Sequence, residues 1–355
     1  MNCCVSIQRN FQRELFVVKY MDNLDTLGRP LRDLRISVTD RCNFRCVYCM
    51  PREVFGPDFQ FLDRDELLTY EEIIRFAKIA VESGVEKIRI TGGEPLVRRD
   101  LPLLIQNLKK LEDLKDLTLT TNGALLADLA APLYDAGLTR ITVSLDSLDE
   151  DIFREMTDST VSVQTVLKGI DEAQKVGLTP IKINVVVKRG VNEQSIVPIA
   201  RYFKDLGHIV RFIEFMDVGN TNAWSLEKVV PAQEILEAIN AELPIEAIPA
   251  NYRGEVAQRY RYLDGSGEFG VITSITQPFC GDCTRARLSP EGELFTCLFG
   301  STGYDFRSLL RTGASDDQIK KELVSLWGRR TDKYSELRTA ATQDLIRVEM
   351  SHIGG

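Results

Sequence analysis

Apolar residues along the first two thirds of the chain follow two alternating periodicities. Short runs rich in valine, isoleucine and leucine predict strands, and the segments between them carry apolar residues every three to four positions, which predicts amphipathic helices. The predicted strands span residues 34–39, 86–91, 116–121, 140–145, 181–187 and 209–215, and the predicted helices span residues 70–84, 101–111, 124–137, 163–177 and 194–207. Strands alternating with helices indicate an α/β protein with a parallel sheet, but a closed barrel needs eight strands. We therefore expect an open, partial (β/α)6 TIM-like barrel.

The pattern changes after Gly219. A further helix is predicted over residues 231–241, and a turn-rich stretch beginning NYRGEVAQ at residue 251 follows it. We expect an N-terminal extension and lead-in over residues 1–30, the barrel over residues 31–218, and a smaller C-terminal α+β domain over residues 219–355.

Composition and charge narrow the class of protein. The chain has 355 residues and a net charge of −8, which argues against a nucleic-acid binder, so a phosphate-bearing ligand would need a local group of basic side chains. No apolar run reaches the roughly 18 residues of a membrane span, and the N-terminus lacks a secretory pattern, so we expect a cytoplasmic protein without membrane contact. Thiols stay reduced there, and eight cysteines then indicate metal ligands before disulfides.

Polar and metal-binding residues follow the predicted strands, at the edge where parallel α/β folds bind ligands. The first strand leads into a loop with Cys42, Cys46 and Cys49, and the sixth leads into Glu214 and Met216. The intervening strands end in TGGEP (91–95), TTNG (120–123) and SLDS (144–147), and the fifth contains Lys182 and Asn184. We expect these groups to gather on one rim of the barrel.

Three cysteines are one too few for a closed four-thiolate site. Thiolates are soft ligands that select zinc or iron–sulfur clusters. In a four-iron cluster, three thiolates leave one iron open to an external ligand. The alternative is a zinc site completed by a residue from elsewhere in the chain.

The cysteine loop RCNFRCVYCMP (41–51), followed by GGEP behind the second strand, resembles the radical S-adenosylmethionine superfamily. The resemblance implies that S-adenosylmethionine binds the open iron and is cleaved to a 5′-deoxyadenosyl radical. It also implies that Tyr48 and Met216 contact the adenine, Gly93 the methionine part, and Ser144 the ribose or carboxylate.

A second group, Cys280, Cys283 and Cys297, has the spacing C-x2-C-x13-C. It is compatible with zinc, its fourth ligand coming from Cys3, Cys4 or His352, or with a second four-iron cluster that has one open iron. Arg285 and Arg287 lie between these cysteines, and on a strand they project to one face. Two guanidiniums on one face match phosphate oxygens, which favours a phosphate site beside the metal group.

Taken together, the motifs resemble the family of radical S-adenosylmethionine enzymes that cyclise GTP in the first step of molybdenum-cofactor biosynthesis. The resemblance runs from about residue 25 to residue 355 and includes KIRITGGEPLVRRDL, ITVSLDSL, KINVVV, FCGDCTRARLSPEGELFTCLF and the final IGG. It implies two 4Fe-4S clusters and a radical that abstracts hydrogen from the 3′ carbon of GTP, so that this carbon attacks C8 of guanine. The product is 3′,8-cyclo-7,8-dihydro-GTP.

The resemblance also implies a GTP site and a catalytic tail. The matching GTP positions are Arg35, Lys87, Arg89, Thr120, Lys182, Arg211, Arg285, Ala286 and Arg287. Lys87 and Arg89 alternate on the second predicted strand and therefore share a face. The resemblance implies that the double glycine, here Gly354 and Gly355, reaches the active site and assists radical initiation, alongside Arg285 and Arg287.

The implied partners are a low-potential electron donor and, functionally, the cyclic pyranopterin monophosphate synthase; a homodimer is compatible with the sequence. Two other interpretations stay open. One is a different radical S-adenosylmethionine enzyme with an auxiliary cluster, such as a peptide-modifying one. The other is a non-enzymatic metal-binding module, which would leave the polar groups at six strand ends unexplained.

Overall fold

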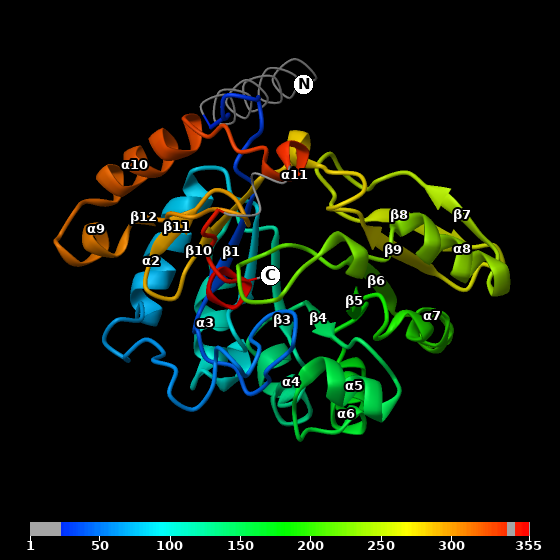
Figure 1. Ribbon diagram of the computed structural model, residues 1–355. Coiled ribbons are helices and arrows are strands. Elements are labelled where there is room, and N and C mark those ends of the chain that lie inside the picture. Colours follow the sequence, from blue (N-terminus) through cyan, green and yellow to red (C-terminus); the bar gives the residue numbers. More distant parts are fainter. Residues whose placement is uncertain (1–22, 339–344, 355) are drawn as a thin grey trace, which may run out of the picture.

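The computed structural model describes residues 23–338 and 345–354 (Figure 1). The first six strands are β1 (Asp33–Ser37), β2 (Lys87–Thr91), β3 (Asp116–Thr121), β4 (Arg140–Ser144), β5 (Lys182–Val187) and β6 (Ile209–Glu214). The later strands are β7 (Ile245–Ile248), β8 (Gln258–Tyr262), β9 (Glu268–Ile272), β10 (Arg285–Leu288), β11 (Glu293–Phe295) and β12 (Tyr304–Asp305). All the predicted strands of the barrel are present, with ends that differ from the prediction by two residues at most.

These strands form one sheet in the order β12-β11-β10-β1-β2-β3-β4-β5-β6-β9-β8-β7, so the barrel is open, as predicted. The segment after residue 218 does not build a separate sheet. Its strand β10 pairs in parallel with β1, and β9 pairs in parallel with β6. Parallel strands therefore extend on both sides of the predicted six, and antiparallel pairs close each edge.

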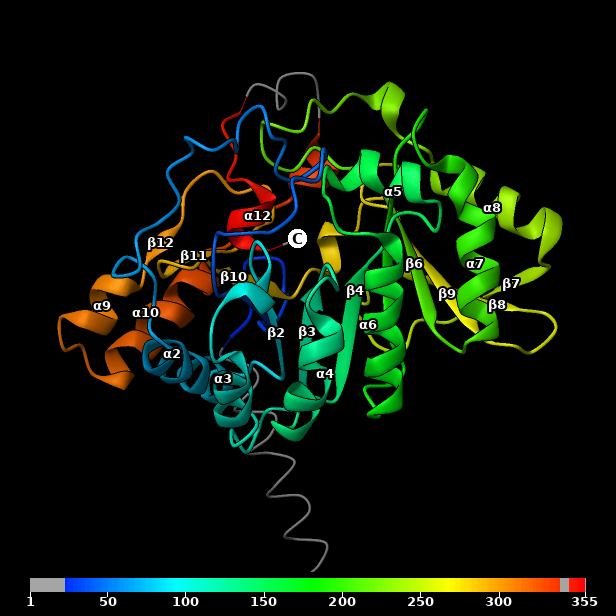
Figure 2. The same cartoon turned by 90° about the horizontal axis from the view of Figure 1, so that it is seen from below.

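The helices cover the outer face of the curved sheet, and Figure 2 shows α2, α3, α4, α6 and α7 around its outside. The α-helices are α2 (Tyr70–Glu82), α3 (Leu101–Leu108), α4 (Leu126–Asp135), α5 (Glu150–Thr157), α6 (Val163–Lys175), α7 (Ile196–Asp205), α8 (Ala232–Glu242), α9 (Arg307–Arg311), α10 (Asp316–Gly328), α11 (Tyr334–Leu337) and α12 (Met350–Ile353). Short 3-10 helices are η1 (Pro95–Val97), η2 (Glu193–Ser195), η3 (Leu226–Lys228) and η4 (Cys280–Asp282).

Local chemistry sets the helix ends. Thr69 and Glu72 form a capping box at the start of α2, because each side chain accepts a backbone N–H of the other residue. The helix ends at Glu82, two residues before its predicted end, and Gly84 then takes a positive φ of 108°. The helix α5 was not predicted; Asp149 caps it by accepting from the backbone N–H groups of residues 151 and 152.

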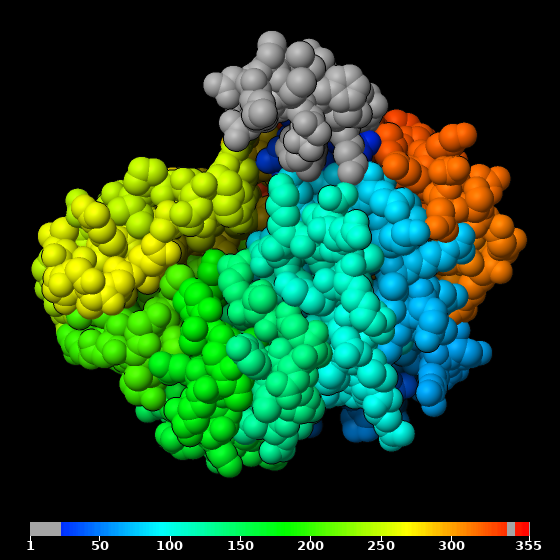
Figure 3. All heavy atoms as spheres, turned by 180° about the vertical axis from the view of Figure 1, so that it is seen from behind, coloured from blue at the N-terminus to red at the C-terminus, as the bar shows by residue number. Residues whose placement is uncertain are grey.

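The apolar faces of these helices pack on the sheet as one core. Phe76 of α2, Phe153 of α5 and Phe203 of α7 are fully buried in it, together with sheet residues such as Ile90 and Phe212. Figure 3 shows the yellow strands β7 to β9 standing out as a lobe at one side of the molecule. Within the described ranges, no helix is long and apolar enough to cross a membrane.

Candidate active site

The first three cysteines lie on the loop after β1. Its turn is fixed because the carbonyl of Cys46 accepts from the backbone N–H groups of Cys49 and Met50, both at 2.9 Å. All three thiols are free and half-buried. Burial raises the pKa of Cys42 to about 12, and it also raises the pKa of Cys46 and Cys49. Buried thiols become thiolates when a positive metal centre binds them, and three sulfur donors suit an iron–sulfur cluster, so the loop fits this group.

Gly93 of the GGEP motif lies against the start of the cysteine loop. Its backbone N–H donates to the carbonyl of Thr39 at 2.8 Å. A Cβ atom at this position would lie 2.7 Å from the carbonyl carbon of Arg41, well inside normal contact. A glycine is therefore required for the second strand end to approach the loop.

Glu94, the acid of the same motif, ties the second strand end to the third. It is buried and accepts hydrogen bonds from Thr121 Oγ1 at 2.7 Å and from the backbone N–H of Asn122 at 2.6 Å. Burial raises its pKa to about 7, against the lowering effect of these donors. Asn122 Nδ2 in turn lies 3.8 Å from Cys42 Sγ. Glu94 thus holds the TTNG loop beside the first cysteine.

Tyr48 points its hydroxyl to the fourth strand end. The hydroxyl donates to Oδ2 of Asp146 at 2.8 Å, and the other carboxylate oxygen of Asp146 accepts from the backbone N–H of Val186. Tyr48 also packs in a small apolar cluster with Phe215, the residue before Met216. Ser144, half-buried, lies opposite Asn184 in the register of β4 and β5. Asp146 and Phe215 hold the Tyr48 side chain in this position. In the sequence, only the SLDS motif, which contains Asp146, indicated a functional role for this strand end.

A separate cavity fills the inside of the barrel and encloses about 1570 Å³, its open mouth included. The predicted residues that line it are Arg35, Lys87, Arg89, Thr120, Lys182, Arg211, Met216, Cys280, Cys283, Arg285, Arg287 and Cys297. The sequence-predicted phosphate residues and the second cysteine group therefore share one cavity, whereas the first cysteines, Tyr48, Gly93 and Ser144 lie outside its lining.

Strand register explains the concentration of positive charge. The parallel pairings place Arg287 beside Arg35, and Arg35 beside Arg89, across β10, β1 and β2. Arg285 lies two residues before Arg287 and lines the same cavity, as the alternation of strand side chains predicts. Ala286, between them, belongs to the buried core on the opposite face, so its side chain does not line the cavity.

Burial and mutual repulsion act on these cations. Burial, together with the charges of Arg287 and Arg89, lowers the pKa of Arg35 well below its usual range. Burial also lowers the pKa of Lys87 to about 8 and, with the charge of Arg211, that of Lys182 to about 7. Among the described residues, Nε of Arg35 and Nε of Arg211 are buried without a hydrogen-bond partner. An anionic ligand would relieve both the repulsion and the missing partners.

The cavity also contains polar contacts that sequence reasoning missed. Lys87 Nζ lies 3.8 Å from Asp33 and 3.7 Å from Asp116, so this cation has acidic neighbours. Asp33 lines the cavity, as do Tyr252 and Glu255 from the turn-rich stretch. The alternation of strand residues could have pointed to Asp33, since it lies two residues before Arg35. Glu214, at the sixth strand end, instead anchors the chain by accepting from three backbone N–H groups.

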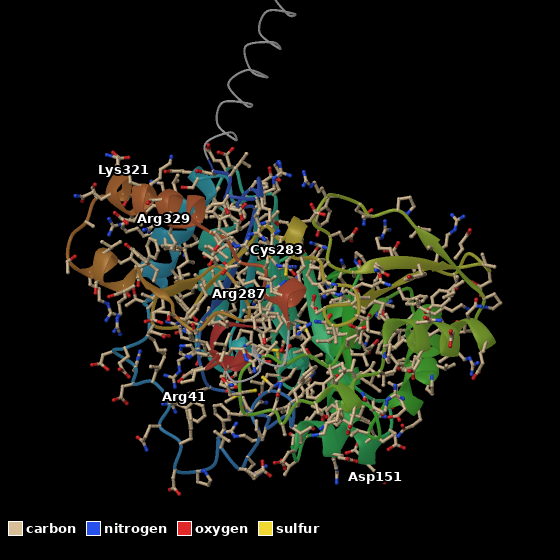
Figure 4. The ribbon with its side chains drawn as sticks, turned by 45° about the horizontal axis from the view of Figure 1, so that its top comes forward. Arg41, Asp151, Cys283, Arg287, Lys321 and Arg329 are labelled. Atoms are coloured by element: carbon tan, nitrogen blue, oxygen red, sulfur yellow. The ribbon has the colours of Figure 1, made fainter. Side chains whose placement is uncertain are left out.

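The second cysteine group lines the same cavity, and Figure 4 shows Cys283 and Arg287 toward the middle of the molecule. Arg285 Nη2 lies 3.5 Å from Cys283 Sγ. Burial raises the pKa of this thiol, but the charges of Arg285 and Arg330 outweigh burial and lower it to about 6. Burial and the negative charge of Asp332 raise the pKa of Cys297 to about 12.

Soft thiolate donors beside cationic side chains fit an anionic iron–sulfur cluster. Within residues 23–338 and 345–354, no three Cys, His, Asp or Glu side chains converge tightly enough to hold a single metal ion. His352, considered as a fourth zinc ligand, bonds to Glu291 Oε1 at 2.7 Å. Cys3 and Cys4 lie outside the described residues.

The C-terminal tail enters the barrel, and Figure 2 shows the C-terminal end inside the curve of the strands. Gly354 is buried with a positive φ of 72°, and its carbonyl accepts a hydrogen bond from Arg287 Nη1. A Cβ atom at Gly354 would collide with the Thr91 side chain at the end of β2. Met350 packs on the apolar cluster around Tyr48. The tail therefore runs from the first cysteine loop to the cation-lined cavity; Gly355 lies outside the described residues.

The open parallel barrel and its three-cysteine loop define a radical S-adenosylmethionine protein. Residues 36–203 match the family model described as Radical SAM superfamily, and residues 208–336 match Molybdenum Cofactor Synthesis C. The chain is 58% identical over 339 residues to a GTP 3′,8-cyclase of Acidothermus cellulolyticus, covering 93% of this chain and 94% of that protein. It is 49% identical to one of Staphylococcus haemolyticus, covering 93% and 98%. The chain belongs to the GTP 3′,8-cyclase family.

Solved structures share the fold at much lower identity. Streptococcus suis SuiB bound to S-adenosylmethionine superposes with a TM-score of 0.59 and 16% identity, covering 89% of this chain and 72% of that one. Native anSMEcpe with bound AdoMet and Kp18Cys peptide gives a TM-score of 0.52 and 15% identity, covering 86% and 87%. At such low sequence identity, these similarities show a shared fold and nothing about function.

Proposed function

We propose that the chain cyclises GTP to 3′,8-cyclo-7,8-dihydro-GTP by radical S-adenosylmethionine chemistry, the first step of molybdenum-cofactor biosynthesis. The observation that carries the proposal is the shared cavity, in which a row of buried guanidiniums leads to a three-cysteine group. The high identity to GTP 3′,8-cyclases over 93% of the chain favours this reaction over a peptide-modifying one. A simple metal-binding module would not need such a cavity.

Cys42, Cys46 and Cys49 would hold the first 4Fe-4S cluster. With S-adenosylmethionine bound, this cluster would supply the electron for 5′-deoxyadenosyl radical formation, and the radical would take hydrogen from C3′ of GTP. The chain itself would position the cosubstrate. Gly93 and Ser144 lie at strand ends whose conformation is fixed by hydrogen bonds of Glu94 and Asp146. Tyr48 is oriented by its 2.8 Å hydrogen bond to Asp146. Met216 follows directly after Phe215, the residue packed on Tyr48.

Cys280, Cys283 and Cys297 would hold the second 4Fe-4S cluster, which would bind the guanine. The triphosphate would lie among the cavity cations Arg35, Lys87, Arg89, Lys182, Arg211, Arg285 and Arg287, with Thr120 as a polar contact. Arg89 Nη1 donates to Thr120 Oγ1 at 2.8 Å, and this hydrogen bond sets the orientation of the Arg89 guanidinium. Ala286 would contribute only through its backbone. Fixing both ends of GTP favours attack within the molecule over quenching of the radical.

The tail would act between the two sites. Gly354 is held by Arg287, a side chain that also lines the GTP cavity. We infer that the double glycine Gly354-Gly355 assists radical initiation, together with Arg285 and Arg287. The reaction requires a low-potential electron donor, and its product would pass to the cyclic pyranopterin monophosphate synthase. We also propose a cytoplasmic location. A homodimer is compatible with the sequence.

The test is 5′-deoxyadenosine formation by anaerobic, cluster-loaded protein with reductant and S-adenosylmethionine. Adding GTP should stimulate formation strongly, whereas ATP should not, because the guanine must reach the second cysteine group. Mass spectrometry should then find the cyclised nucleotide in amounts that match 5′-deoxyadenosine. Formation that ignores GTP would keep the radical chemistry and contradict the proposed substrate.

A further inference from the structure

A buried ion network lies directly behind the second cysteine group. Asp25, from the predicted lead-in, binds Arg29 Nε through Oδ2 at 2.6 Å and Arg330 Nη1 through the same oxygen at 3.1 Å. The side chains of all three residues are at most 1% exposed. The network joins the first described segment of the chain to the segment after α10, about 300 residues later in the sequence.

The two guanidiniums bind the backbone of each cysteine segment. Arg29 Nη1 donates to the carbonyl of Cys280 at 2.6 Å, and Arg330 Nη1 donates to that of Cys283 at 2.8 Å. Arg330 Nε donates to the carbonyl of Thr296, the neighbour of Cys297, at 3.0 Å. All three parts of the C-x2-C-x13-C pattern are therefore tied to two adjacent positive charges.

The surrounding contacts hold the backbone of both arginines and the guanidinium of Arg330 in place. Trp327 Nε1 donates to the carbonyl of Arg29 at 2.9 Å, and Thr26 Oγ1 donates to that of Arg330 at 2.7 Å. Arg330 also lies over the Trp327 ring, 4.6 Å from its centroid. Burying two arginines is expensive, and apolar side chains would pack the same space at less cost. Their hydrogen bonds to the carbonyls of Cys280, Cys283 and Thr296 indicate a role toward the cysteine site.

We propose that Arg29 and Arg330, bridged by Asp25, are positioning residues for the second cluster. They hold the three cysteine segments in the arrangement that receives the cluster. Their charges also offset the carboxylates of Asp25 and Asp332, which would otherwise disfavour its reduced, more negative form. This rests on the proposed function, in which that site holds an iron–sulfur cluster. The lead-in is then part of the auxiliary site, a role that its sequence did not reveal.

The experiment isolates the second site by changing Cys42, Cys46 and Cys49 to Ser in the full chain. In this background, Arg29→Gln and Arg330→Gln are compared with Arg75→Gln. Arg75 is the control, because its guanidinium also binds a carboxylate, that of Asp316 at 2.8 Å, and backbone carbonyls, but those of Leu310 and Ala314 and not those of the cysteine segments. Iron and sulfide content, iron loss to a chelator and the midpoint potential followed by electron paramagnetic resonance are measured without GTP or S-adenosylmethionine.

Both glutamine variants should retain iron roughly 10- to 100-fold less well and show a lower midpoint potential, while Arg75→Gln matches the parent. If a glutamine variant fails to fold by circular dichroism, Arg29→Lys and Arg330→Lys replace it. The lysine variants keep the positive charge but lack the several fixed donors of a guanidinium. They should therefore weaken iron retention more than they change the midpoint potential. Retention and potential equal to those of the parent in all foldable variants would overturn the proposal.

The two proposals can fail separately. A chain that cyclises GTP, but keeps its iron and its potential in both glutamine variants, contradicts the positioning role alone. A chain that shows no GTP-dependent turnover, but loses iron in those variants, keeps the positioning role and contradicts the substrate. Zinc in place of iron in the anaerobically loaded parent contradicts the iron–sulfur assignment on which both depend.

Discussion

The guanidinium of Arg287 donates a hydrogen bond to the carbonyl of Gly354, the next-to-last residue of the chain. The same arginine lines the cation-rich cavity and pairs in register with Arg35. One side chain thus links the C-terminal tail to the proposed triphosphate site. Binding of GTP and placement of the tail are therefore expected to depend on each other.

Gly354→Ala should reduce GTP-dependent turnover by about tenfold or more while both clusters assemble. The new methyl group would meet the Thr91 side chain, and the positive φ of 72° is unfavourable for alanine. The measurement is single-turnover 5′-deoxyadenosine formation together with iron content. Gly313→Ala is the control, because Gly313 also has a positive φ, of 82°, but meets no atom within 4 Å. Equal turnover in the two variants would contradict a role for the tail's position.

Binding of GTP should take up protons above pH 7. In the free cavity burial lowers the pKa of Lys182 to about 7, so this lysine is largely neutral at pH 8. A bound triphosphate favours the charged form and raises the pKa again. Affinity should therefore fall as pH rises above about 7, until the pKa of the complex is reached. Calorimetry at pH 8 in buffers of different ionisation enthalpy measures the uptake.

Lys182→Met removes this titrating group and should reduce the proton uptake. It should also weaken GTP binding by about 10- to 100-fold, since a charge-assisted hydrogen bond contributes roughly 1.5–3 kcal/mol. Lys175→Met, at an exposed ion pair on α6, is the control. Proton uptake that is the same in Lys182→Met as in the parent would show that another group titrates.

Tyr48→Phe should weaken the binding of S-adenosylmethionine and lower stability. The change leaves Oδ2 of the buried Asp146 without its 2.8 Å donor, a loss of about 1–3 kcal/mol in unfolding free energy. Thermal unfolding tests the second part, and the dependence of the turnover rate on S-adenosylmethionine concentration tests the first. The double variant Tyr48→Phe with Asp146→Asn should recover part of the stability. No change in either quantity would mean that this hydrogen bond does not orient the ring.

Gly93→Ala should cost the first cluster and spare the second. The added Cβ would lie 2.7 Å from the carbonyl carbon of Arg41, so the cysteine loop must move away from the GGEP turn. Iron per chain should fall by about half if the two sites fill independently. Gly328→Ala is the control, since a Cβ there meets nothing within 4 Å. Full iron content in Gly93→Ala would contradict the close approach.

The strands of the barrel could be predicted because each is a short apolar run bounded by turn residues. The pairing of β10 with β1 could not, since Leu34 and Ala286 meet across about 250 residues of sequence and neither carries a local signal of its partner. The contacts of Asp25 and Arg29 could not be predicted for the same reason. Asp25 and Arg29 form their buried ion pairs only in the folded chain, where they lie next to Arg330 and the second cysteine group.

In the candidate site too, relationships within one strand could be predicted from the sequence, whereas contacts between strands could not. Alternation along one strand predicted that Arg285 and Arg287 share a face, and that Lys87 and Arg89 do. It did not predict that Lys87 lies between Asp33 and Asp116, because ion pairs across strands depend on register. The motif GGEP was recognised for its glycines, whereas the link from Glu94 to Thr121 required the folded strands.

The central claim is that GTP lies between the two cysteine groups, with its 3′ carbon exposed to the radical. The direct test uses GTP carrying deuterium at C3′, with anaerobic, cluster-loaded protein, reductant and S-adenosylmethionine. Deuterium should move to 5′-deoxyadenosine, as mass spectrometry measures. If GTP stimulates formation of 5′-deoxyadenosine that carries no deuterium, hydrogen is taken from another position, and the proposed placement of GTP in the cavity is wrong.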